Sequence, residues 1–121
     1  MKQERALVID DDLSVRVFLT RLLKRCGWEV FAAGDAAGAS KAFEAGKYEL
    51  GLIDVDLGGG VDGLAIAREF HRRDPRPAIV MMLGDPANKD RVLLEDGPDA
   101  FLAKPFTIDE FQTVLFKTFH S

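Results

Sequence analysis

Five short apolar runs, separated by segments of a different periodicity, constrain the fold of this chain more than any other feature. The runs cover residues 6–9, 30–33, 50–53, 78–83 and 100–103. None alternates strictly between apolar and polar residues, which is typical of strands covered on both faces in a parallel sheet. Parallel strands need long crossover connections, so the segments between the runs are expected to be helices.

Apolar residues in the connecting segments recur at helical spacing. In the first segment, six of them would share one face of a helix that ends at Gly27: Val15, Phe18, Leu19, Leu22, Leu23 and Cys26. Further helices are predicted over 36–45, 64–73, 88–96 and 108–119, the last with Thr107 as its N-cap. Four residues of that last helix are expected to face inward: Ile108, Phe111, Leu115 and Phe119.

The order βαβαβαβαβα predicts one doubly wound α/β domain over residues 1–121, since crossovers between parallel strands are right-handed. Hydrophobic residues make up 47% and charged residues 30% of the chain, as in soluble globular domains. No apolar run approaches the roughly 20 residues of a membrane span, and no secretion signal is visible, so a cytoplasmic location is expected.

The net charge of −4 argues against a nucleic-acid surface. The single cysteine, Cys26, is interpreted as buried filler.

Acidic residues follow two of the predicted strands, and a lysine follows a third. Residues 10–12 are all aspartate, Asp54 and Asp56 end the third run, and Lys104 ends the fifth. In an open α/β sheet the ligand site lies outside the carboxyl ends of the strands, so these residues are expected to form one acidic mouth. Converging carboxylates favour a hard divalent cation such as Mg²⁺. With a lysine opposite, one carboxylate can attack phosphorus and form an acyl phosphate. The alternative is that these acidic residues are solvated loop residues and helix caps.

The sequence resembles the receiver domain of two-component response regulators along essentially its whole length. The matching pieces are Leu7-Val8-Ile9-Asp10-Asp11-Asp12, Leu52-Ile53-Asp54, Val61-Asp62-Gly63-Leu64, Gly97-Pro98-Asp99-Ala100-Phe101 and Lys104-Pro105-Phe106. Each piece alone is weak, but together and in this order they are specific. The resemblance implies a flavodoxin-like five-stranded parallel sheet with strand order 2-1-3-4-5.

The resemblance also implies a role for each residue of the acidic mouth. Asp54 would accept the phosphoryl group, and Lys104 would pair with that group. Asp10, Asp11, Asp54 and the backbone carbonyl of Asp56 would hold Mg²⁺. The phosphoryl group would come from a sensor histidine kinase or a histidine phosphotransfer protein, so the domain is not expected to be a turnover enzyme. The peptide bond between Lys104 and Pro105 would be cis.

Two positions depart from the family pattern, and both are positions where receiver domains usually change conformation on phosphorylation. Counting back without gaps from Lys104 places Met82 where receivers usually have Thr or Ser, and Leu83 where a small residue is usual. A thioether cannot donate a hydrogen bond, so a phosphoryl group on Asp54 would lose the contact that distinguishes the active state. Phe101 stands where the family has an aromatic that moves with that hydroxyl, and it suits simple burial equally well.

The loop over residues 54–63 also departs, because it is about one residue longer than the commonest pattern and holds three consecutive glycines. With Asp56 close to the acceptor and only Gly84 opposite it, we expect any phosphoryl group to be open to water and short-lived. Phe116 lies at the edge of the apolar stripe of the last helix. It is either a partly buried edge residue or part of a dimer or partner surface on the fourth and fifth helices.

Two other functions stay open at this point. The first is a phosphate-independent interaction module, a pseudo-receiver in which Met82 and Leu83 have disconnected the switch. The second is a phosphohydrolase, because residues 52–56 also resemble the DxD motif of the haloacid dehalogenase superfamily; 121 residues are short for that fold. No output domain is visible, so we expect either a single-domain regulator or a piece of a longer protein.

Overall fold

The computed structural model describes residues 4–85, 87–93 and 97–120. Strands and helices alternate throughout this part of the chain, and their bounds are β1 (Arg5–Ile9), α1 (Leu13–Arg25), β2 (Glu29–Ala33), α2 (Ala36–Ala45), β3 (Leu50–Asp54), α3 (Gly63–His71), β4 (Ala78–Leu83), α4 (Asn88–Leu93), β5 (Ala100–Ala103) and α5 (Ile108–His120). All strand pairs are parallel, and the order in the sheet is β2-β1-β3-β4-β5. The predicted fold class and strand order are therefore confirmed.

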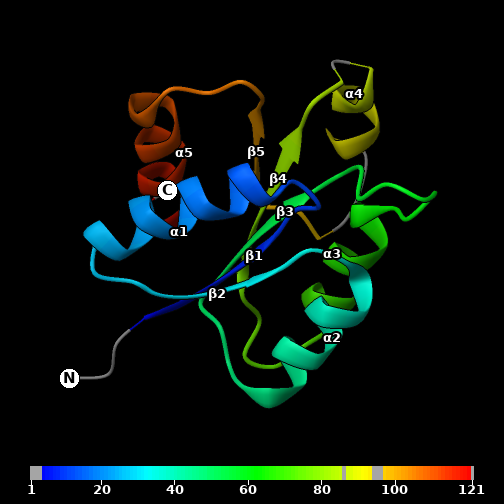
Figure 1. Cartoon of the computed structure of the whole chain (residues 1–121), viewed down its shortest axis with the longest axis horizontal. Coiled ribbons are helices and arrows are strands. Elements are labelled where there is room, and N and C mark those ends of the chain that lie inside the picture. Colours follow the sequence, from blue (N-terminus) through cyan, green and yellow to red (C-terminus); the bar gives the residue numbers. More distant parts are fainter. Residues whose placement is uncertain (1–3, 86, 94–96, 121) are drawn as a thin grey trace.

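Helices cover both faces of the sheet and make two apolar cores. Figure 1 shows α1 and α5 on one face, with α2 and α3 on the other. Successive strand residues point to opposite faces, so Leu7 and Ile9 of β1 pack with α2 and α3, while Ala6 and Val8 pack with α1 and α5. This two-sided burial explains why the strands read as continuous apolar runs. The edge strand β2 is an exception: Phe31 is exposed, because β2 has a neighbour on one side only.

Helix ends follow side-chain caps that the sequence contains. Asp12 accepts the backbone N–H of Ser14 at 2.8 Å and begins α1. Thr107 caps α5 as predicted, because its hydroxyl accepts the N–H of Glu110 and the Glu110 carboxylate accepts the N–H of Thr107, both at 3.0 Å. The predicted end of the fourth helix at 96 lies outside the described residues.

Four predicted inward positions are wrong. Cys26 is exposed rather than buried, because α1 ends at Arg25 and Cys26 is its C-cap. Phe18 of α1 is 41% exposed, and Ile108 and Phe119 of α5 are 47% and 39% exposed. Ile108 and Phe119 lie in the first and last turns of the thirteen-residue α5, whose rise of about 20 Å exceeds the roughly 13 Å span of β5.

The bond between Lys104 and Pro105 is cis, as expected, and so is the bond between Asp74 and Pro75. Within the described residues, no helix is long and apolar enough to cross a membrane.

We predict that Phe70→Ala lowers the free energy of unfolding by about 3–5 kcal/mol, measured by urea denaturation. Phe70 is fully buried, and its ring stacks on Phe43 with centroids 3.9 Å apart, so its loss leaves a cavity between α2, α3 and the sheet. Phe116→Ala is the matched control, because that ring is 64% exposed, and it should change stability by no more than about 0.5 kcal/mol. Equal losses in the two variants would contradict this account of the core.

Candidate functional site

The predicted acidic residues meet at the carboxyl ends of β1 and β3. Ile9 pairs with Ile53 in the parallel register, so Asp10 and Asp54 follow side by side. They are the only charged side chains that are buried in the described part of the chain. A buried carboxylate needs a partner, because the loss of hydration costs several kcal/mol per ion.

Lys104 supplies that partner for both carboxylates. Its Nζ donates to Asp10 Oδ2 at 2.6 Å and to Asp54 Oδ2 at 3.0 Å. The lysine reaches them because β5 lies in the same parallel sheet, and it follows β5 directly. The remaining oxygens are also used: Asp10 Oδ1 accepts the N–H of Asp12, and Asp54 Oδ1 accepts the N–H of Asp56.

Burial and pairing shift the protonation equilibria of this cluster. Burial raises the pKa of the Asp54 carboxyl above its ordinary value, and the hydrogen bond from Lys104 only partly opposes that rise. Burial alone would lower the pKa of Lys104, but its hydrogen bonds to Asp10 and Asp54 outweigh that effect and raise the pKa. The ammonium is therefore charged at neutral pH.

The carboxylates of Asp10, Asp11 and Asp54 are close enough to share one cation. One oxygen from each lies within 4.8 Å of the other two. Oxygen ligands of this kind are those that Mg²⁺ prefers, so the donor set fits the predicted metal. Asp11 is exposed, which leaves the cluster open to solvent on one side.

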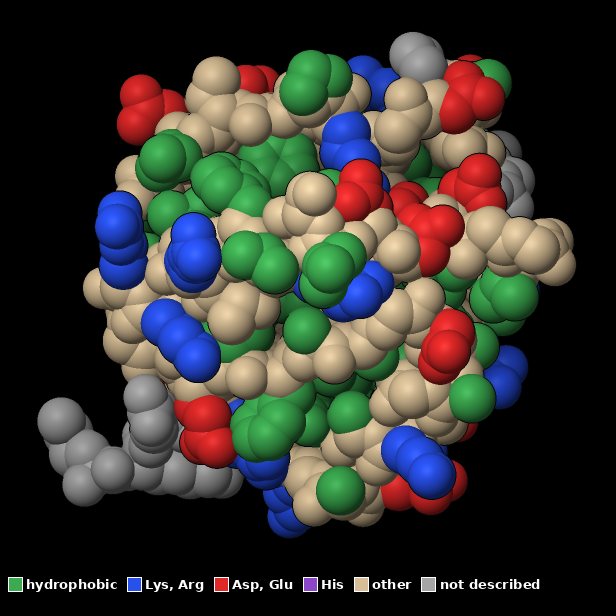
Figure 2. All heavy atoms as spheres, viewed as in Figure 1, with side chains coloured by type: hydrophobic (Ala, Val, Ile, Leu, Met, Phe, Trp, Pro, Cys, Tyr) green, Lys and Arg blue, Asp and Glu red, His purple; other side chains and the backbone are tan. Residues whose placement is uncertain are grey.

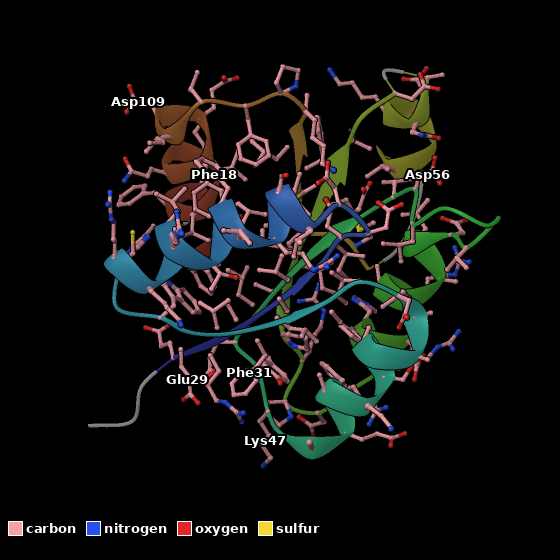
Figure 3. All side chains as sticks on the ribbon, viewed as in Figure 1. Phe18, Glu29, Phe31, Lys47, Asp56 and Asp109 are labelled. Atoms are coloured by element: carbon pink, nitrogen blue, oxygen red, sulfur yellow. The ribbon has the colours of Figure 1, made fainter. Side chains whose placement is uncertain are left out.

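A cavity of about 300 Å³ opens in front of Asp54. Its lining residues come from the carboxyl ends of β1, β3, β4 and β5 and the connections that follow them, and they are Asp11, Asp54, Asp56, Gly58, Gly84, Asp85, Asn88 and Lys104. Figure 2 shows acidic side chains gathered at this end of the molecule, and Figure 3 places Asp56 there, near α4. Asp85 and Asn88 were not predicted as site residues; the one signal for them in the sequence is that they follow β4, at the edge where the strand ends converge.

The glycine-rich loop folds into an ordered turn. Gly58, Gly59 and Gly60 have φ angles of +76°, +58° and +79°, a left-handed conformation that favours glycine. The N–H of Val61 donates to the carbonyl of Gly58, which closes the turn. Gly63, at the start of α3, packs so tightly on Asp54 that a Cβ there would collide with the Asp54 carbonyl.

The three predicted switch residues are all packed into the domain. Met82 pairs with Asp54 in the sheet, and its side chain is fully buried in the core beneath α1 and α5. Leu83 is buried on the opposite face. Phe101 is partly buried, and the Nζ of Lys89 lies 5.4 Å from its ring centroid.

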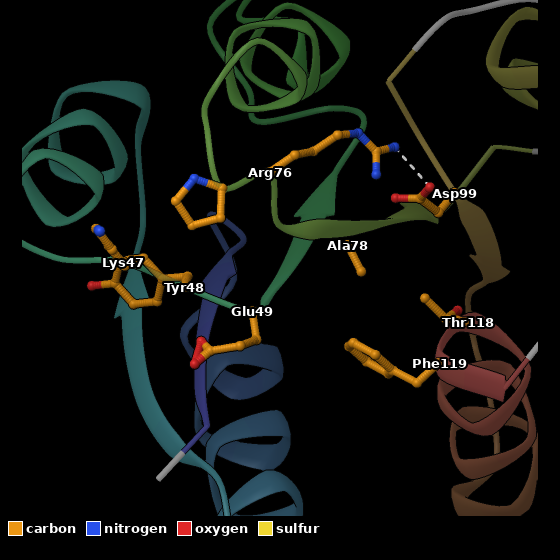
Figure 4. A pocket seen from close by; sticks show the side chains of 9 residues that line it. Lys47, Tyr48, Glu49, Arg76, Ala78, Asp99, Thr118 and Phe119 are labelled. Atoms are coloured by element: carbon orange, nitrogen blue, oxygen red, sulfur yellow. Dashed lines mark hydrogen bonds and ion pairs between the residues drawn. The ribbon is translucent and has the colours of Figure 1, made fainter. Parts of the chain in front are cut away.

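A second hollow, of about 430 Å³, lies at the other end of the sheet (Figure 4). Its lining includes Tyr48, Arg76, Asp99 and Phe119. Arg76 Nη2 is paired with Asp99 Oδ1 at 2.7 Å, and Asp99 Oδ2 also accepts the N–H of Ile79. This hollow brings together none of the predicted site residues, and its charged pair serves to join β4 and β5.

Comparison with known proteins agrees with this geometry. The family model described as "Response regulator receiver domain" matches residues 6–116. The chain is 32% identical over 107 residues to the transcriptional regulatory protein TcrA of Mycobacterium tuberculosis, covering 88% of this chain and 42% of that protein. It is also 32% identical over 105 residues to the alkaline phosphatase synthesis transcriptional regulatory protein PhoP of Bacillus subtilis, covering 86% and 43%. The chain thus spans less than half the length of these curated relatives.

Solved structures of response regulators are also similar to this chain. The response regulator TrrA of Thermotoga maritima, in complex with Mg²⁺ and BeF, superposes with a TM-score of 0.84 and 27% identity, covering 96% of this chain and 99% of that one. NtrX of Brucella abortus, in complex with ATP, superposes with a TM-score of 0.85 and 28% identity, covering 97% of this chain and 27% of that one.

We predict that Gly63→Ala lowers the free energy of unfolding by about 2–3 kcal/mol, because the added methyl group meets the backbone of Asp54 and neither can move cheaply. Gly84→Ala is the matched control, since a Cβ there meets no atom within 4 Å. Thermal or urea unfolding of both variants measures the difference. An unchanged stability in Gly63→Ala would contradict the close packing of α3 against Asp54.

Proposed function

The chain belongs to the receiver domain family of response regulators, and we propose that it accepts a phosphoryl group on Asp54 in two-component signalling. The observation that carries the proposal is the position of Lys104, whose Nζ bonds both Asp10 and Asp54 beside an open cavity. The donor is proposed to be a sensor histidine kinase or a histidine phosphotransfer protein, in the cytoplasm.

Asp10, Asp11 and Asp54 would hold Mg²⁺ with their carboxylates, and Asp56 would add its backbone carbonyl. When bound, Mg²⁺ neutralises negative charge on the transferred phosphoryl oxygens. The chain's own part is to supply a carboxylate that is buried, held in place and paired with an ammonium.

In the proposed transfer, an oxygen of Asp54 attacks the phosphorus of a phosphohistidine. The new O–P bond forms as the N–P bond breaks, and the histidine ring leaves with its electron pair and takes a proton from water. Lys104 lies beside the accepting oxygen and offsets its charge during the transfer. A domain that accepts one phosphoryl group on Asp54 acts as a signalling module and not as a turnover enzyme.

The proposed contact with the kinase lies on α1, beside the site. Leu13, Val17 and Phe18 are exposed there, Leu13 at 64%. Next to them, Phe18, Pro105, Phe106 and Lys104 line an apolar groove of about 490 Å³. Figure 3 shows Phe18 on this face, between α1 and α5. Exposed apolar area of this kind marks an interaction surface, and Lys104 connects it with the acidic cavity.

One observation favours the second candidate, a phosphate-independent interaction module. Met82 is the strand neighbour of Asp54, is fully buried, and carries no hydrogen-bond donor. In such a module the acidic cluster would remain as a metal site, and partner binding would not depend on Asp54.

We predict that incubation with acetyl phosphate and Mg²⁺ adds the mass of one phosphoryl group, with release of acetate, and that Asp54→Ala abolishes the gain. Intact-protein mass spectrometry measures it. Chelation of Mg²⁺ should reduce the gain strongly, because the carboxylates of Asp10, Asp11 and Asp54 then repel the incoming phosphate.

Asp99→Ala is the control for this experiment, because Asp99 lies at the other end of the sheet. A mass gain that persists in Asp54→Ala would place the acceptor elsewhere. No gain in the native protein under any condition would make the interaction module the leading function.

We also propose that α4 and α5 form a dimer or partner surface. Phe116 of α5 is 64% exposed, and its ring stacks on the neighbouring His120 ring with centroids 4.2 Å apart, so the partly buried alternative is wrong. Phe116→Asp should lower the dimer fraction of the phosphorylated protein at least about tenfold, because it places a charge in an apolar contact. Light scattering measures the mass, Lys117→Asp serves as a control for the added charge, and identical masses for native and Phe116→Asp protein would refute the surface.

A further inference from the structure

We infer that the side-chain amide of Asn88 contacts the phosphoryl group on Asp54, in place of the hydroxyl that Met82 does not offer. This inference rests on the proposed function and deepens it, because it names the residue through which α4 would respond. It concerns the part of the cavity formed by the connection from β4 to α4; Asp11 and Asp54 of the metal cluster line the same cavity.

The chemistry of the cavity lining leaves few candidates. Four of its residues are aspartates and two are glycines, so only Lys104 and Asn88 carry a side-chain hydrogen-bond donor among the described residues that line it. Lys104 donates to Asp10 and Asp54, and under the proposed function it offsets the charge of the accepted group. A phosphoryl group has three oxygens that accept hydrogen bonds, and the Asn88 amide has two N–H donors.

Asp54 and Asn88 line the same cavity. Gly84 lies on the same wall, and a Cβ built there would meet no atom within 4 Å. Met82 does not enter this space, because its side chain is buried with Leu102 and Phe111 in the core beneath α1 and α5. The cavity therefore runs from the acceptor carboxylate to Asn88 without a side chain of β4 in between.

The connection from β4 to α4 holds Asn88 at the cavity wall. Asp85 Oδ1 accepts the N–H of Ala87 at 2.9 Å, and the Asp85 carbonyl accepts the N–H of Asn88 at 3.0 Å. Both bonds tie the start of α4 to Asp85, and Asn88 is half-buried and lines the cavity with Asp54. The Nζ of the next residue, Lys89, lies over the ring of Phe101 in β5. A displacement of Asn88 would therefore be passed to β5 through Lys89.

The test measures binding of beryllium fluoride with Mg²⁺, a stand-in for a phosphoryl group on a carboxylate, by ¹⁹F NMR titration. Asn88→Ala should weaken that binding about tenfold, since a hydrogen bond to a charged group is lost. Asp90→Ala, two residues along the same helix, should bind as the native protein does, and chemical denaturation of each variant checks that it is folded.

Two further measurements separate a direct contact from a structural effect. In ¹⁵N-labelled native protein, the side-chain amide signal of Asn88, assigned by its absence in Asn88→Ala, should shift when beryllium fluoride binds. Met82→Thr restores a hydroxyl beside Asp54, and in the Asn88→Ala background it should recover most of the lost affinity.

The outcomes distinguish this inference from the function on which it rests. Native protein that binds no beryllium fluoride and gains no phosphoryl mass overturns the proposed function, and the role of Asn88 with it. Native protein that binds, with Asn88→Ala binding equally well or with an amide signal that does not move, overturns the role of Asn88 alone.

Discussion

The bonds from Lys104 to Asp10 and Asp54 are the constraint on which the rest of this structure depends. They join residues 94 and 50 positions apart in the chain, so they form only when β1, β3 and β5 end at one level of the sheet. Removing the lysine would leave two carboxylates buried without a cation, at a cost of several kcal/mol. The same strand order therefore brings the two carboxylates together and supplies the lysine that stabilises them.

Aspartates around this edge divide into two groups that only the structure separates. Asp12 and Asp62 accept N–H groups of Ser14 and Leu64 and serve as helix caps. The carboxylates of Asp10, Asp11 and Asp54 instead lie close together, and Lys104 pairs with Asp10. Both groups follow strands, because a crossover helix begins where a strand ends, and a residue that caps a helix is the same type that binds a cation.

Burial explains which predictions from the sequence succeeded. Strand positions were predicted within one residue, since a strand covered on both faces admits few polar residues, and the motif residues follow the strands directly. Helical periodicity gives the direction of a side chain but not how much of it the neighbouring elements cover, so Cys26, Phe18 and Ile108 were predicted to be buried and are exposed. Asp85 and Asn88 belong to no motif, and their place at the cavity depends on a turn that burial does not dictate.

Under the proposed function, the same difference separates the residues that accept a phosphoryl group from those that respond to it. Accepting a phosphoryl group needs residues fixed by strands, and Asp54 and Lys104 are held by the core and by each other. Responding to it needs a part that can move at little cost, and Gly84, Asp85 and Ala87 after β4 are exposed, with Asp85 bonded to Ala87 within the same connection. Met82 belongs to the fixed half, because moving it would open the core beneath α1 and α5. Under the proposed function, a response to phosphorylation would therefore begin in the loop after β4 and not in the strand.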